Sequence, residues 1–146
     1  MHTPTARRSS LFLMELLIAI LFFSIAAAVC VRIFVKSYTL EQESRELDHA
    51  VNLSASIGEI IRHSKGDLEV CSELLENEYP TGTWTEDTFA LTFDTDWTPC
   101  DESSAVYTVL VQFERDETLL IGHIDVSLAD RNIYSLTVEK AMEDAI

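Results

Sequence analysis

The stretch that decides the fold of this chain is SSLFLMELLIAILFFSIAAAVCV, residues 9–31. From Leu11 to Val31 there are 21 residues, and Glu15 is the only charged one. A helix of this length rises about 30 Å, which is enough to cross the hydrocarbon core of a bilayer. We therefore expect residues 11–35 to form a transmembrane helix. A carboxyl group inside such a segment is costly, so Glu15 is a candidate functional residue.

The residues before the apolar stretch form a short polar leader. Met1 to Ser10 contains Arg7 and Arg8 and no acidic residue. We expect residues 1–10 to be a cytoplasmic leader. Arg32 and Lys36 follow the apolar stretch, so the basic residues on its two sides are nearly balanced and do not set its orientation.

After the apolar stretch the sequence predicts that the same helix continues as an amphipathic helix over residues 36–66. Arg62, His63 and Lys65 followed by Gly66 are typical of a helix C-terminus. Acidic residues, Glu46 among them, fill much of the polar side. Apolar or small residues at steps of mostly three or four define the predicted core-facing stripe: Leu40, Leu47, Val51, Ser54, Ile57 and Ile61.

The remaining residues, 67–146, are expected to form an external α+β head. Asp67 to Thr85 is predicted to be a connecting region with a short helical turn. Beyond it, apolar residues alternate with polar ones, which predicts strands. Short loops between consecutive strands favour antiparallel pairing. The predicted fold is thus a long helix packed on a four-stranded antiparallel sheet. The expected strands are Thr88–Asp94, Ala105–Glu114, Thr118–Leu128 and Ile133–Glu139.

The charge of the chain is concentrated in this second part. The whole chain has a formal net charge of −15, and residues 41–146 hold 24 acidic and 6 basic residues, a net charge of −18. Such a domain repels the phosphates of nucleic acids and anionic membrane surfaces. We expect a soluble head that does not bind nucleic acid directly.

The chain has three cysteines, and two of them lie in the head. If the head is outside the cell, Cys71 and Cys100 are candidates for a disulfide that closes a long loop. The alternative is two reduced, buried thiols that act as small apolar residues. The sequence leaves both interpretations open.

The start of the apolar stretch carries a resemblance to a known family. Arg7 and Arg8, followed by Leu11-Phe12-Leu13-Met14-Glu15, resemble the processing site of type IV prepilins and pseudopilins. That family pattern is a short basic leader, a small residue that is nearly always Gly, an apolar residue, Thr-Leu-any-Glu and a long apolar helix. Here Leu13 and Glu15 match the Leu and the Glu. Ser10 stands where Gly is usual, and Phe12 stands where Thr is usual.

The resemblance implies a pilin-like fold and a structural, non-enzymatic role without a cofactor. It implies that a prepilin peptidase cuts between Ser10 and Leu11, that Leu11 is N-methylated, and that Glu15 is matched to the new N-terminal amine of a neighbouring subunit. The expected partners are other pilins or pseudopilins and an inner-membrane assembly platform. The expected role is that of a minor pilin or pseudopilin in a type IV pilus, a competence pseudopilus or a type II-like secretion filament.

Two other functions remain open at this point. The chain can be a single-pass membrane protein whose extracytoplasmic domain binds a ligand or partner. Alternatively, Ala26-Ala27-Ala28 is a signal-peptide cleavage site, and the domain is secreted after Ala28. Glu15 inside the apolar region and the apolar residues that continue to Val35 argue against this cleavage. A lipid-modified Cys30 is disfavoured, because Val29 is larger than such sites require.

The other candidate residues favour ordinary structural roles. The acidic loop that contains Asp94, Asp96, Asp101 and Glu102 lacks the central Gly and distal Glu of a calcium loop, so we expect a solvated loop. The histidines do not have the spacing of metal ligands. The aromatic residues of the connecting segments are expected to cap the edge of the core, and the alternative is contact with neighbouring subunits. The histidines in question are His49, His63 and His123, and the aromatic residues are Tyr79, Trp84 and Trp97.

Overall fold

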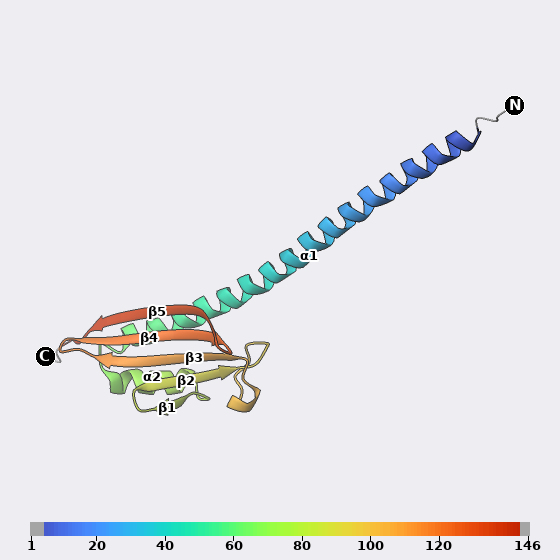
Figure 1. Cartoon of the computed structure of the whole chain (residues 1–146). Coiled ribbons are helices and arrows are strands. Elements are labelled where there is room, and N and C mark those ends of the chain that lie inside the picture. Colours follow the sequence, from blue (N-terminus) through green and yellow to red (C-terminus); the bar gives the residue numbers. More distant parts are fainter. Residues whose placement is uncertain (1–4, 144–146) are drawn as a thin grey trace. The chain divides into compact units, whose positions relative to one another are not determined.

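The computed structural model describes residues 5–143, with side chains from Arg8 onward, so the first four residues of the predicted leader lie outside it. The chain divides into two compact units, Met1–Glu43 and Ser44–Ile146. Figure 1 shows a long helix, a shorter helix and an antiparallel sheet. The elements are α1 (Thr5–His63), α2 (Leu68–Glu78), β1 (Thr83–Thr85), β2 (Thr88–Phe93), the 3-10 helix η1 (Glu102–Ser104), β3 (Tyr107–Arg115), β4 (Leu119–Leu128) and β5 (Arg131–Ala141).

Helix α1 is continuous from the leader into the second unit, which confirms the predicted long helix. It starts at Thr5, earlier than expected, so residues 5–10 are also helical. No Pro occurs between Thr5 and His63, and Gly58 is the only Gly, so nothing in this range interrupts the helix. Basic residues in the last turn and the left-handed Gly66 (φ 82°) end it as the sequence predicted.

The sheet has five strands in the order β1-β2-β3-β4-β5, all antiparallel, so the prediction of four strands was wrong. The additional strand, β1, lies inside the predicted connecting region. It has only three residues and is too short to show an alternating pattern. A tight turn containing Glu86 (φ 54°) returns the chain from β1 to β2.

The face of α1 that packs on the sheet differs from the predicted stripe. Ser54, Ile57 and Ile61 are buried as expected, but Leu47 and Val51 are exposed, as is Leu40 in the first unit. The buried face continues instead with Ala50, which lies beside the predicted stripe, and with Glu46, which was expected on the polar side. Small residues at this face let the helix approach the sheet closely, and hydrogen bonds satisfy the Glu46 carboxylate. The predicted stripe therefore has the correct helical period, but in its first half it lies on a different side of α1 from the side that faces the sheet.

Both helices of the second unit pack against one face of the sheet (Figure 1). Gly122 of β4 leaves room for this packing, because a Cβ there would lie 2.6 Å from Ile61 Cδ1 and the Ile61 side chain would have to shift. Helix α2 is longer than the predicted short turn, and the Asp67 side chain caps it by accepting a hydrogen bond from the Glu69 N–H. The buried core consists of Ala50, Ile57, Ile61, Cys71, Leu75, Phe89, Leu91, Phe93, Tyr107, Val109, Val111, Phe113, Leu120, Ile124, Val126 and Val138.

Candidate functional site

The apolar segment of α1 is exposed along its whole length. The structure's described residues include one helix that is long and apolar enough to cross a membrane, with a mean hydropathy of 2.7 in its most apolar window. None of that window is buried by the rest of the described chain. Phe12 and Leu11 at its start are 67% and 68% exposed, and Phe34 near its end is 81% exposed. An apolar surface of this size is not stable in water, so a bilayer or other apolar helices must cover it.

The three residues of the predicted processing site lie at the start of this segment. Ser10, Leu11 and Glu15 are all helical and exposed. Leu11 and Glu15 are four residues apart and therefore lie on the same side of the helix. Among the residues whose side chains are described, Glu15 has no hydrogen-bond or ion-pair partner. The local geometry thus presents an apolar surface with one unpaired carboxyl group.

The hydroxyl groups of Ser24 and Thr39, in the first unit, are hydrogen-bonded within the helix itself. The Ser24 hydroxyl donates to the Ile20 carbonyl at 2.8 Å, and the Thr39 hydroxyl donates to the Val35 carbonyl at 2.9 Å. Such bonds let a hydroxyl enter an apolar environment without an external partner. A carboxyl group is different, because in an apolar environment it needs a positive partner or a proton. Glu15 is therefore the residue of this segment that needs a positive partner or a proton in an apolar environment.

A second polar cluster lies in the head, and the sequence analysis missed it. The Glu46 carboxylate, which is 8% exposed as a residue, accepts a hydrogen bond from Arg131 Nη2 at 2.9 Å and one from the Tyr107 hydroxyl at 3.3 Å. Burial, and then the nearby Glu46 carboxylate, raise the pKa of Tyr107. These three residues join α1 to the starts of β3 and β5. Local spacing in the sequence does not predict these contacts, because Glu46 and Arg131 are 85 residues apart.

Trp97 completes this end of the head. Its ring stacks on Tyr107 with a centroid distance of 4.1 Å and on His49 with a distance of 5.1 Å, so it caps the core edge as predicted. Trp97 has a positive φ of 59°, and Asp94 supports this turn by accepting hydrogen bonds from the N–H groups of Asp96 and Thr98. Asp94 thus orders its own loop. Residues 5–143 contain no group of three or more His, Cys, Asp or Glu side chains arranged to hold a metal ion.

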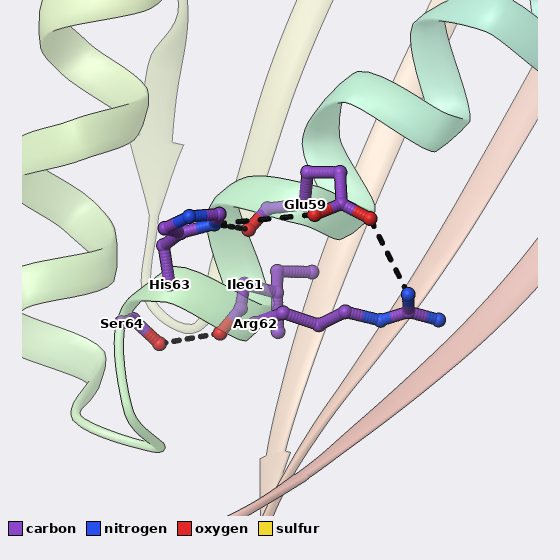
Figure 2. A network of polar contacts seen from close by, with 5 residues as sticks. All are labelled: Glu59, Ile61, Arg62, His63 and Ser64. Atoms are coloured by element: carbon purple, nitrogen blue, oxygen red, sulfur yellow. Dashed lines mark hydrogen bonds and ion pairs between the residues drawn. The ribbon is translucent and has the colours of Figure 1, made fainter.

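The C-terminal end of α1 carries a cluster of short-range polar contacts. The Glu59 carboxylate accepts a hydrogen bond from Arg62 Nη1 at 3.3 Å, and His63 Nδ1 lies 2.9 Å from the Glu59 backbone oxygen (Figure 2). The Ser64 hydroxyl donates to the Ile61 carbonyl at 2.7 Å. The Glu59, Arg62 and His63 side chains are more than half exposed, so the ion pairs contribute little to stability. We assign this cluster to helix termination.

The two head cysteines do not form a disulfide in this structure, and both are free. Cys71 is buried against Ser64, at the end of α1. Cys100 lies beside Thr92, to which its backbone is hydrogen-bonded. On the Cys71 side, Ile61 lies one turn before Ser64 and packs under Gly122 of β4. On the Cys100 side, Thr92 pairs with Thr108 of β3, which pairs in turn with Ser127 of β4. Ser127 is five residues further along β4 than Gly122. Five residues of a strand span about 17 Å, so Cys71 and Cys100 lie beside different parts of the sheet.

The buried Cys71 thiol should make the free energy of unfolding of the head fall at alkaline pH. Burial raises its pKa from 9.0 to about 11, and the hydrogen bond with Ser64 opposes part of the rise. The folded protein keeps the proton where the unfolded chain loses it, so this contribution to stability is complete below about pH 9 and is lost as the pH rises toward 11. The wild-type protein should lose unfolding free energy between pH 8 and 11. In Cys71→Ala we expect this loss to be about 2 kcal/mol smaller than in the wild type, as measured by urea unfolding. Cys30→Ala should retain the wild-type pH profile, and an unchanged profile in Cys71→Ala would contradict the assignment.

No protein-family model, curated protein or solved structure matches this chain. The evidence for its function therefore comes from its own residues. The strongest parts of it are the uncovered apolar segment and the unpaired Glu15 within it.

Proposed function

We propose that this chain is a minor pilin or pseudopilin, a structural subunit of a type IV pilus, a competence pseudopilus or a type II-like secretion filament. The observation that carries the proposal is Glu15, a carboxyl group without a partner among the described side chains, in an uncovered apolar segment of 21 residues. The bilayer covers the apolar side chains but offers this group no partner. Packing of several such helices supplies both an apolar cover and, from a neighbouring subunit, an amine for the carboxylate.

The leader is consistent with this chemistry. Arg8, Ser9 and Ser10 are exposed and precede Leu11 directly, so the bond between Ser10 and Leu11 lies at the boundary between polar and apolar residues. In the proposal, a prepilin peptidase cuts this bond, and the new amine on Leu11 is the group that pairs with Glu15 of a neighbour. Methylation of Leu11 belongs to the same proposal.

Helix continuity favours a retained anchor over release after Ala28. α1 runs through Ala26–Ala28 without interruption. A domain released at that point would still begin with exposed apolar residues, among them Ile33 and Phe34, which are 64% and 81% exposed. These side chains would promote aggregation of a secreted domain. In a membrane-anchored chain they belong to the covered segment.

The proposed location and partners follow from this assignment. The chain crosses the cytoplasmic membrane once, with the leader inside and the acidic head outside. Its partners are other pilins or pseudopilins, which it contacts through α1, together with the prepilin peptidase and an assembly platform in the membrane. The charge of the head opposes direct binding of DNA, so a role in DNA uptake would act through these partners.

The proposal is tested by the N-terminus of the mature chain. We expect the full chain, co-expressed with a prepilin peptidase and extracted from membranes, to start at Leu11, as shown by intact mass and N-terminal sequencing. Ser10→Gly restores the usual family residue and should be cut at least as completely. Substitution of Ser10 by the bulky Leu should block the cut and keep the chain full-length.

Other start sites would support the competing functions. A chain that starts at Met1 in both the wild type and Ser10→Gly is a permanent membrane anchor, and the filament proposal is then wrong. A chain that starts near Val29 is a secreted domain, and Glu15 then has no role in the mature protein.

A further inference from the structure

The free edge of the sheet at β5 is long and open. β5 is the last strand of the sheet, and within residues 5–143 it pairs only with β4. It has 11 residues, whereas β1 at the opposite edge has three. The backbone groups on the outer side of an edge strand are a template for a further strand. The length of β5 therefore gives room for a segment of another chain.

The register shift between Val126 and Ser127 of β4 leaves Ile133 of β5 as a bulge, but beyond it the middle of β5 lacks the other features that usually protect an edge. Residues 133–138 read Ile-Tyr-Ser-Leu-Thr-Val, with no charge, no Pro and no Gly. β-branched and aromatic residues favour strand pairing, and natural proteins guard such edges with Lys, Pro, bulges or very short strands. Here the charged residues stand only at the two ends of the strand, at Arg131 and at Glu139 and Lys140. An unguarded centre of this kind is expected where pairing is functional.

An exposed apolar side of α1 lies next to this edge. Leu47 and Val51 are 44% and 36% exposed, and with Gly58 they share one side of the helix, at spacings of four and seven residues. Gly58 faces β5, since a Cβ on it would lie 3.2 Å from Val138 and 3.6 Å from Leu136. In Figure 1, the part of α1 that belongs to the second unit runs alongside β5. A strand added to β5 would place its inward side chains over Leu47 and Val51.

Geometry and charge decide the kind of occupant. In the head, α1 and β5 run in the same direction, because Glu46 contacts Arg131 at the start of β5 and Gly58 faces Val138 near its end. Antiparallel pairing of two β5 strands would therefore make the two α1 helices antiparallel, which does not suit copies anchored in one membrane. Two copies of residues 41–146, each with a net charge of −18, also repel each other. A different protein with positive charge fits better.

We propose that the β5 docking surface, formed by the outer edge of β5 with Leu47 and Val51, binds an extended basic segment of a partner protein by strand addition. Backbone hydrogen bonds to β5 provide the affinity, the alternate apolar side chains of the segment cover Leu47 and Val51, and its basic residues face the acidic head. The docking surface belongs to the head and does not depend on cleavage at Ser10. A test of strand addition at β5 is therefore independent of the test of the filament proposal.

Hydrogen exchange on the full chain in detergent micelles tests this surface. The probe is a blocked peptide of about ten residues that alternates valine and lysine. We expect it to slow amide exchange in residues 131–141 about tenfold and to leave β1 unchanged. A peptide that alternates valine and glutamate, and a valine–lysine peptide with two central prolines, should have no effect. The first reverses the charge, and the second cannot form the hydrogen bonds.

Variants separate the docking surface from other exposed apolar residues. Leu47→Ser with Val51→Ser should weaken peptide binding at least fivefold, because the inward side chains lose their apolar cover. Val70→Ser with Leu74→Ser, a matched change of two exposed residues on α2, should leave binding unchanged. Near-wild-type circular dichroism shows that both proteins are folded. The proposal is overturned if residues 131–141 are not protected, if the acidic peptide protects them equally, or if protection centres on α2.

Discussion

Arg131→Ala is expected to lower the free energy of unfolding of the head by about 2 kcal/mol, which corresponds to a fall in Tm of about 10 °C. The reason is the environment of Glu46, whose side chain is only 10% exposed and whose ion-pair partner is Arg131, at 2.9 Å. Without Arg131 the carboxylate stays buried with the Tyr107 hydroxyl alone. Half of the Arg131 side chain is exposed, so we expect less than the full cost of a completely buried pair. Chemical unfolding of the purified chain measures the difference.

The matched variant Glu46→Leu distinguishes a buried charge from lost packing. It removes the carboxylate and leaves Arg131 free to turn into solvent, so it should change stability by less than about 1 kcal/mol. Adding Arg131→Ala to Glu46→Leu should then cost little, because the interaction is already absent. Glu46→Leu should also lower the pKa of Tyr107, which can be followed by ultraviolet titration of the tyrosines. If Arg131→Ala is as stable as the wild type, Glu46 does not depend on the ion pair.

Glu15→Ala is expected to reduce the amount of this chain in sheared filaments at least tenfold, while the amount in the membrane and the cut before Leu11 remain unchanged. The apolar segment loses no apolar surface in this variant, so membrane insertion is preserved or improved. What it loses is the group that we propose pairs with an amine of a neighbouring subunit. In a water-poor helix bundle such a pair outweighs the 1.4 kcal/mol that a tenfold change requires. Immunoblots of the filament and membrane fractions measure both amounts.

Two further variants define the role of the Glu15 charge. Glu15→Gln keeps the shape and the hydrogen-bonding capacity but removes the charge, so it should resemble Glu15→Ala if pairing with an amine is the basis of assembly. Glu76→Ala removes an exposed carboxylate from α2 of the head and should assemble normally. Wild-type amounts of Glu15→Ala in filaments would show that Glu15 is not an assembly residue, even if Ser10 is cut.

Much of the architecture follows from local patterns in the sequence. The uninterrupted run from Leu11 to Val31 and the absence of Pro through His63 predicted α1, because a helix needs only local hydrogen bonds and no breaker. Alternation in Thr88–Phe93 predicted β2, and the short polar stretches predicted the hairpins. Glu15 was identified for the same reason, since one charge in an apolar helix is visible without any tertiary structure. The processing site at Ser10 and Leu11 rests on the resemblance and awaits its test.

Other features depend on contacts between residues far apart in the chain. The sequence by itself determined the long helix, the apolar segment with Glu15 and the antiparallel α+β head, because periodicity and composition act over a few neighbouring residues. Only the tertiary structure decided that Glu46 faces the core, that Leu47 and Val51 remain exposed beside β5, and that Cys71 and Cys100 lie apart. Those outcomes are set by which side of α1 fits the sheet and by Arg131, which supplies the charge that Glu46 needs. That choice is made by packing and electrostatics between distant segments, and it leaves no periodic trace in the sequence.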